Sequence, residues 1–259
     1  MTAYFVDVDG GRLRYRLDGG TNTPVLVLSN SLGTNLSMWE PQMGELTRGF
    51  RVLRYDTRGH GESSVTPGPY SIERLGRDVV ALLDRLGIDR AHFCGLSLGG
   101  MTGMWLAIHA PTRLSRLALC NTAAHMPPAD LWNGRIDQVR GGGMEAIVAP
   151  VLARWFTPDF LARSPDIAAS VRQMVLATPA DGYIACCAAI RDMDQREAIA
   201  GISAPTLVIA GTHDPATPPA DGRFIADHIA GARYVELPAA HLSNIEAGRD
   251  FTAALLNFL

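Results

Sequence analysis

Short apolar runs alternate with amphipathic segments along most of this 259-residue chain. The runs are continuously hydrophobic, which is typical of strands covered on both faces of a parallel sheet. Two segments at 4–8 and 13–17 flank the turn Asp9-Gly10-Gly11 and predict an antiparallel hairpin. Further strands are predicted at 24–28, 51–55, 91–96, 114–119, 205–210 and 232–237.

Helical periodicity separates several of these strands. In the segment 71–86, Ser71 occupies the N-cap position, and Glu73 and Arg77 are spaced as an i,i+4 ion pair. Alternating strands and helices of this kind predict an α/β fold with a doubly wound, mostly parallel sheet.

The pattern changes between residues 122 and 201, where there is no convincing strand. Four helices are predicted there, at 129–140, 144–156, 165–177 and 180–194. Gly141-Gly142-Gly143 is expected to end the first helix, and Ser164 and Pro165 to cap and begin the third. Because the strand pattern resumes at 205, we predict a helical cap (122–201) inserted into an α/β core (1–121 and 202–259).

A candidate nucleophile lies where the strand 91–96 meets a helix. Gly95-Leu96-Ser97-Leu98-Gly99 has the G-x-S-x-G pattern of a nucleophile elbow. The sharp turn forces an unusual backbone conformation on the serine and requires small neighbours, which the two glycines supply. We therefore predict that Ser97 is a catalytic nucleophile.

A serine hydroxyl needs a base to take its proton and an acid to orient that base. Asp214 and His241 each follow a predicted strand, in the chain order Ser, Asp, His typical of this elbow. Because parallel strands end at one edge of a sheet, the three side chains should meet there. His213 is a competing base, and His60 is interpreted as part of a structural turn.

An oxyanion hole should complete this site. One donor is expected to be the backbone N–H of Leu98, directly after the nucleophile. For the second we choose the N–H of Leu32, in the loop that follows the strand 24–28.

Composition excludes several other chemistries. The formal charge is −3, so no basic surface favours nucleic acid or an anionic membrane as a partner. All 23 basic residues are Arg, which excludes Schiff-base lysines, lysine-bound pyridoxal phosphate and a P-loop lysine. The four cysteines form no C-x-x-C pair, and we predict no metal, cofactor or disulfide. Cys94 and Cys120 are interpreted as small buried hydrophobes.

The sequence shows neither a membrane-spanning segment nor a signal peptide. No apolar run reaches the ~18 residues of a membrane span, and MTAYFVDVDG lacks the apolar core of a signal peptide. We expect a cytoplasmic protein; the sequence predicts no oligomeric state.

These motifs resemble the α/β-hydrolase superfamily over the whole chain. Within it, the chain is most similar to the 3-oxoadipate enol-lactonases. The segments that carry the likeness are SNSLGTNLSMWEPQM, RYDTRGHGESS, FCGLSLGGMTGMWLA, GTHDPATPP and AAHLSNIEA. Asn30-Ser31 replaces the His-Gly of many superfamily members, and the enol-lactonases look similar at this point. A serine nucleophile, rather than an aspartate, argues against dehalogenases and epoxide hydrolases.

The resemblance implies a substrate and a reaction. The substrate would be a small anionic enol lactone, opened to 3-oxoadipate in the β-ketoadipate pathway of aromatic catabolism. Its acetate arm needs a cation in an otherwise apolar pocket. In the predicted helix 129–140 the apolar stripe comprises Leu131, Trp132, Ile136 and Val139.

Arg135 falls inside that stripe. Its guanidinium either binds the substrate carboxylate while Trp132 packs over the lactone ring, or pairs with an acid such as Asp130, or reaches solvent. The rival anion ligands are Arg140, Arg154, Arg163, Arg172 and Arg191.

The same motifs are compatible with two other activities. The same triad would serve a cofactor-free perhydrolase or haloperoxidase-like esterase, with hydrogen peroxide in place of water. A slow-turnover ligand receptor on a hydrolase fold is the alternative from a different class.

Overall fold

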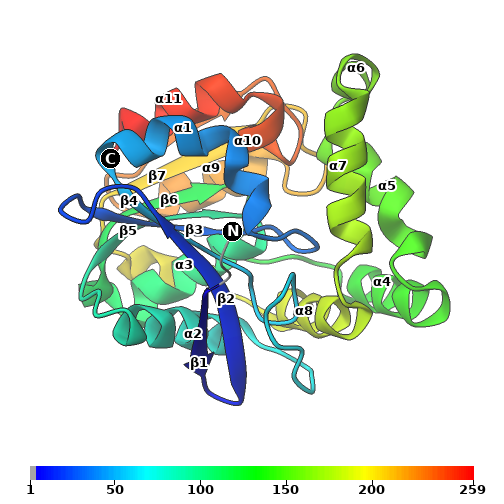
Figure 1. The fold of residues 1–259 in the computed structure, drawn as a ribbon. Coiled ribbons are helices and arrows are strands. Elements are labelled where there is room, and N and C mark those ends of the chain that lie inside the picture. Colours follow the sequence, from blue (N-terminus) through cyan, green and yellow to red (C-terminus); the bar gives the residue numbers. More distant parts are fainter. Residues whose placement is uncertain (1–3) are drawn as a thin grey trace.

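The computed structural model describes residues 4–259 and is built around one eight-stranded sheet (Figure 1). The strands lie in the order β1-β2-β4-β3-β5-β6-β7-β8. Their bounds are β1 (Tyr4–Val8), β2 (Gly11–Asp18), β3 (Val25–Ser29), β4 (Arg51–Tyr55), β5 (Ala91–Leu96), β6 (Leu114–Cys120), β7 (Thr206–Gly211) and β8 (Arg233–Leu237). All eight predicted strands are present, and β2 is longer than expected at both ends.

The sheet is parallel except at its β1 edge. Strand β2 pairs antiparallel with both β1 and β4, so the predicted hairpin is confirmed. From β4 to β8 every pairing is parallel. Leu26, Val27 and Leu28 of β3 are fully buried, as expected for a strand covered on both faces.

Helices cover the two faces of the sheet (Figure 1). Helices α1 and α11 pack together on one face, and α2 packs on α3 on the other. Their bounds are α1 (Glu40–Gly49), α2 (Ile72–Arg85), α3 (Leu98–His109), α9 (Pro219–His228), α10 (Ser243–Glu246) and α11 (Gly248–Leu256), with 3-10 turns η1 (Leu36–Trp39), η2 (Pro111–Arg113) and η3 (Ala198–Gly201). Ser71 caps α2 as predicted, because its hydroxyl accepts the Arg74 N–H at 3.1 Å.

The segment between β6 and β7 forms the helices that we call the cap helices. They are α4 (Ala129–Gly142), α5 (Glu145–Trp155), α6 (Pro158–Arg163), α7 (Pro165–Leu176) and α8 (Ala180–Asp192). Figure 1 shows them gathered beyond the edge where the parallel strands end. The division of the chain into core and cap domains stays a prediction.

Three details of the cap helices correct the sequence analysis. Gly141 and Gly142 continue α4, and only Gly143, with φ 64°, ends it. Helix α6 was missed, since its six residues are too few to show a helical period. Among the described residues, Ser164 makes no side-chain capping bond to α7.

One further observation concerns the lengths of the helices. Within residues 4–259, no single helix is both long and apolar enough to cross a membrane, and only α7 with α8, bent by 91°, meet that test as a pair.

Candidate active site

Ser97 occupies a tight turn between β5 and α3. Its φ of 56° is in the left-handed region, where a non-glycine residue is strained. A Cβ at Gly95 would lie 2.1 Å from the Gly99 carbonyl oxygen, and one at Gly99 would lie 2.2 Å from the Ser29 carbonyl oxygen. The glycines are therefore required by the close approach of three backbone segments.

The predicted acid and base lie against each other. Asp214 follows β7, His241 follows β8, and His241 Nδ1–H donates to Asp214 Oδ2 at 2.8 Å. This bond leaves Nε2 as the nitrogen free to take a proton. Burial opposes ionisation of Asp214, but the charge and hydrogen bond of His241, together with the hydrogen bonds from Asn121 and Thr217, outweigh it and hold the pKa of Asp214 below its usual value.

Two further side chains fix the Asp214 carboxylate. Oδ2 also accepts from the Thr217 hydroxyl at 2.7 Å and from Asn121 Nδ2 at 3.0 Å. Asn121, directly after β6, has φ 43° and bonds the Ala240 carbonyl as well, at 3.2 Å. Neither residue was predicted from the sequence, because neither belongs to a spacing motif. The one signal in the sequence was an asparagine close to a predicted strand end, since asparagine adopts the left-handed backbone more readily than most residues.

Ser97 and His241 line the same small cavity, of about 40 Å³. Leu32, Trp132 and Arg135 also line it, so the cavity joins the sheet edge to α4. The Ser97 carbonyl accepts the Thr122 hydroxyl at 2.8 Å, and a hydrogen bond between the Ser97 hydroxyl and His241 stays a prediction. A larger hollow of about 960 Å³ lies between the loop 65–69 and helices α4 and α8, and none of the three predicted catalytic side chains lines it.

The two predicted oxyanion donors are Leu98, the next residue in the chain after this serine, and Leu32, which lines the same cavity. Leu98 is the first residue of α3, so its N–H has no acceptor within the helix. Leu32 lines the cavity, and neither N–H has a partner among the described residues. The next amide, Gly33 N–H, donates to His60 Nε2 at 2.9 Å. His60 thus does more than shape its own turn: it contacts the loop that is predicted to hold the oxyanion.

Ser31 belongs to the same loop, and no role was predicted for its side chain. Its hydroxyl is buried and has no hydrogen-bond partner within residues 4–259, and the residue lines the cavity. Many superfamily members have His-Gly here, so the Asn30-Ser31 of this chain places an extra hydroxyl in the oxyanion loop.

Arg135 and Trp132 lie together in the cavity wall. The Arg135 guanidinium is 4.9 Å from the centre of the Trp132 ring, a cation–π contact. The Trp132 indole N–H donates to the Met126 carbonyl at 3.0 Å. The alternative ion pair to Asp130 is not formed within the described residues. Of the predicted apolar stripe, Trp132, Ile136 and Val139 are buried, whereas Leu131 is 53% exposed and lies outside the buried face of α4.

One of the rival arginines shares this cavity. Arg154 lines it with Arg135, and burial together with the nearby Arg135 charge lowers the pKa of Arg154. The others lie elsewhere and have partners: Arg140 on Asp137, Arg172 on Glu145, Arg191 on Asp192 and Arg163 over the Phe160 ring. Within the described chain no carboxylate lines the cavity, so its two guanidiniums favour an anion.

The His241 loop is tied to the cap helices. Trp155 stacks beside the His241 ring at 6.4 Å, and its carbonyl accepts the Leu242 N–H at 3.1 Å. The Glu246 carboxylate accepts from the Ala240 N–H at 2.9 Å, from the Thr157 N–H at 3.3 Å and from the Thr157 hydroxyl. One carboxylate thus joins the loop that carries the predicted base to the junction of α5 and α6.

A sequence model of the α/β-hydrolase fold matches residues 24–164. The chain belongs to the α/β-hydrolase family. This hydrolase is 45% identical, over 94% of its length and 91% of the relative, to 3-oxoadipate enol-lactonase 2 of Acinetobacter baylyi. It is 41% identical to 3-oxoadipate enol-lactonase 1 of the same organism, over 96% and 94% of the two chains.

A solved structure agrees with these relatives. The enol-lactonase from Burkholderia xenovorans is 50% identical and superimposes with a TM-score of 0.97, covering 98% of this hydrolase and 99% of that chain. The predicted fold, with its hairpin and its mostly parallel sheet, and the resemblance to the enol-lactonases are therefore confirmed.

Proposed function

We propose that this α/β-hydrolase opens 3-oxoadipate enol-lactone to 3-oxoadipate, with Ser97, His241 and Asp214 as the catalytic triad. The observation that carries the proposal is the cavity that Ser97 and His241 share with Arg135 and Arg154. A hydrolytic serine beside two guanidiniums suits a small ester that bears a carboxylate. The names of the enol-lactonase relatives supply the identity of that ester.

The proposed reaction begins at Ser97. His241 Nε2 takes the hydroxyl proton as Oγ attacks the lactone carbonyl, and Asp214 stabilises the resulting imidazolium. The N–H groups of Leu32 and Leu98 hold the tetrahedral oxyanion. The ring C–O bond then breaks, and the enol oxygen leaves with the proton that His241 returns. The released enol tautomerises to the ketone while its carbon skeleton stays on Ser97 as an acyl ester.

Water completes the cycle. His241 takes a proton from water, whose oxygen attacks the acyl ester and displaces Ser97. The product is a dicarboxylate, since hydrolysis creates a second carboxylate beside the one in the acetate arm. In this proposal Arg135 binds the acetate arm, Trp132 packs over the ring, and Arg154 adds positive charge at the same end of the cavity.

Steady-state hydrolysis of the enol lactone tests the proposal. The wild-type protein is expected to turn over many times, and Ser97→Ala is expected to lower kcat on the order of 10⁵-fold. Turnover that survives in the Ser97→Ala variant rejects the nucleophile. A single burst without further turnover favours the ligand receptor, and faster reaction with hydrogen peroxide than with water favours the perhydrolase.

A further inference from the structure

His60 connects two loops through its ring nitrogens. Nε2 accepts the Gly33 N–H at 2.9 Å, and Nδ1 lies 3.3 Å from the Arg58 carbonyl oxygen. Since a backbone N–H only donates and a carbonyl only accepts, the ring is the neutral tautomer with its proton on Nδ1. The side chain is completely buried, so no solvent competes for either nitrogen.

The bonded amide lies next to a predicted oxyanion donor. Gly33 follows Leu32 and has φ 79°, a backbone conformation that glycine adopts without strain. The peptide that carries Gly33 N–H is the one directly after the peptide that carries Leu32 N–H. The two planar peptides meet at the Leu32 Cα and are related only by φ and ψ of Leu32, whose allowed ranges are narrow, so fixing the Gly33 N–H restricts the direction in which the Leu32 N–H can point.

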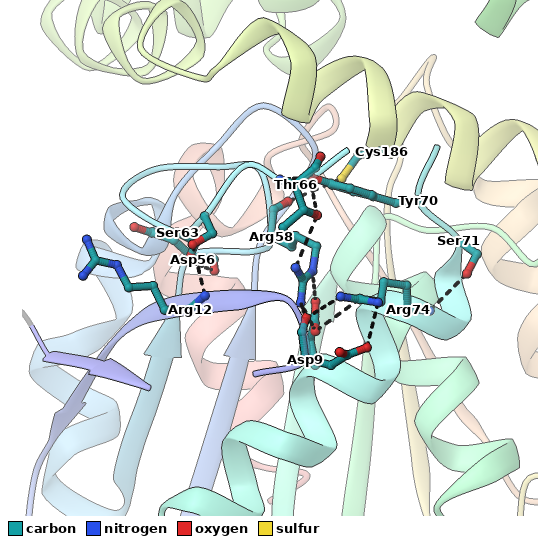
Figure 2. A network of polar contacts seen from close by, with 12 residues as sticks. Asp9, Arg12, Asp56, Arg58, Ser63, Thr66, Tyr70, Ser71, Arg74 and Cys186 are labelled. Carbon is teal, nitrogen blue, oxygen red and sulfur yellow. Dashed lines mark hydrogen bonds and ion pairs between the residues drawn. The ribbon is translucent and has the colours of Figure 1, made fainter. Parts of the chain in front are cut away.

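The loop that carries His60 is itself held firmly (Figure 2). The Arg58 guanidinium donates to both Asp78 oxygens at 2.7 and 2.6 Å, and to the Asp9 carbonyl at 2.8 Å. Arg74 reaches the Asp9 carboxylate at 3.0 Å, as the network in Figure 2 shows. These charge-assisted bonds fix the backbone from which His60 extends.

A second side chain of the same loop also contacts the oxyanion segment. Asp56 Oδ1 accepts the Leu36 N–H at 2.8 Å, three residues beyond Gly33. The loop after β4 therefore supports the loop after β3 at two points. Asp56 fixes its far end, and His60 fixes the peptide beside the predicted donor.

We infer that His60 is a positioning residue for the oxyanion hole: it holds the Gly33 peptide so that Leu32 N–H is aimed at the lactone carbonyl oxygen. The inference rests on the proposed function, because it concerns the transition state of that reaction. Burial lowers the pKa of His60 to about 4, which keeps Nε2 an acceptor at neutral pH.

Two substitutions separate this role from support of the local turn. His60→Gln places an amide oxygen near the position of Nε2 and preserves an acceptor for Gly33. His60→Asn places an amide N–H near the position of Nδ1 and preserves the bond to Arg58, but leaves the Gly33 amide without an acceptor. A residue that merely shapes its own turn would tolerate Asn better than Gln.

The experiment measures kcat and KM for both variants on the enol lactone, with thermal unfolding as a check on folding. His60→Asn is expected to lower kcat roughly 30-fold with KM within roughly 3-fold of wild type, since oxyanion donors act on the transition state. His60→Gln is expected to stay within roughly 3-fold of wild type in both constants.

Each contrary result has a distinct meaning. A folded His60→Gln variant that loses more than about 10-fold in kcat overturns the inference by itself, as does a loss in His60→Asn confined to KM. Ser97→Ala, measured in the same assay, separates the two proposals. If it stays active, the proposed nucleophile fails; if it is inactive while the two His60 variants behave alike, only the inference about His60 fails.

Discussion

The Asp214 carboxylate receives more hydrogen bonds than one histidine requires. Besides His241, it accepts from the side chains of Asn121 and Thr217 and from the N–H groups of Ala216 at 2.8 Å and Thr217 at 3.0 Å. A buried anion needs several donors to replace lost water. The same bonds fix the direction in which the carboxylate faces the imidazole.

Asn121→Gly is a direct test of that arrangement. Glycine tolerates the left-handed backbone at 121 but removes the donors to Asp214 and to the Ala240 carbonyl. We expect kcat to fall roughly 10-fold and the free energy of unfolding to fall by about 1–2 kcal/mol. Enzyme kinetics and urea unfolding measure the two effects, and wild-type kcat in this variant would show that Asp214 does not depend on Asn121.

Arg135→Ala tests how the cavity recognises charge. The variant is expected to lose about 2–4 kcal/mol in kcat/KM on the anionic lactone and little on a neutral ester of similar size. Arg140→Ala is the matched control, since Arg140 lies on the same helix, pairs with Asp137 and does not line the cavity. Equal losses of Arg135→Ala on both substrates would contradict a carboxylate-binding role.

The predicted catalytic residues were found in the sequence because a local motif or a strand end marks each of them, and their roles stay predictions. Ser97 lies in a pattern, and Asp214 and His241 each follow a strand, so the sheet edge brings them together. Asn121 meets Asp214 across 93 positions of sequence, and no local pattern signals that contact. His60 was placed in a turn correctly, but its bond to Gly33 depends on how two loops pack.

At the scale of elements, α8 approaches the loop of His60 very closely. A Cβ at Gly182 would lie 2.0 Å from the Gly59 carbonyl oxygen, so Gly182→Ala would force the helix and the loop apart. We expect the free energy of unfolding to fall by about 1–3 kcal/mol, as in other overpacked contacts.

Gly134→Ala is the matched comparison, since it is expected to raise the free energy of unfolding where Gly182→Ala lowers it. Gly134 lies inside α4, and a methyl group added there would have nothing within 4 Å, so alanine should stabilise by about 0.5–1 kcal/mol. Urea unfolding of both variants measures the difference. If Gly182→Ala is as stable as Gly134→Ala, α8 and the loop can move apart without a loss in the free energy of unfolding.

The helices and strands were largely predictable, because the order of apolar and polar residues within each segment indicates strand burial and helical periodicity. The exceptions were short or depended on distant packing. Helix α6 begins at Pro158 after a Thr157 cap and ends within six residues. Leu131 satisfied the apolar stripe on a helical wheel, yet that side of α4 has no neighbour among the described residues to cover it.

For the whole molecule, the buried His60 predicts how stability depends on pH. Its pKa is about 4 when folded and about 6.5 when exposed, so the unfolded chain binds more protons between those values. The free energy of unfolding should therefore fall as the pH drops from about 6.5 to about 4, by about 3 kcal/mol from this residue.

Urea unfolding at several pH values, with His60→Gln as reference, isolates that contribution. Glutamine does not titrate, so the difference between wild type and variant should shrink or reverse as the pH falls. A difference that stays constant from about pH 7 to about pH 4.5 would show that His60 does not titrate as its burial requires.

The hydrogen bonds of the Glu246 carboxylate limit which segments can be exchanged between this hydrolase and another. It accepts from Thr157 at the start of α6 and from Ala240 beside the imidazole of His241. A chimera that exchanges residues 122–201 for the equivalent segment of another hydrolase would leave this anion short of donors unless the graft keeps a hydroxyl at 157. Swapping specificity in this chain therefore requires matching one threonine as well as the residues that touch substrate.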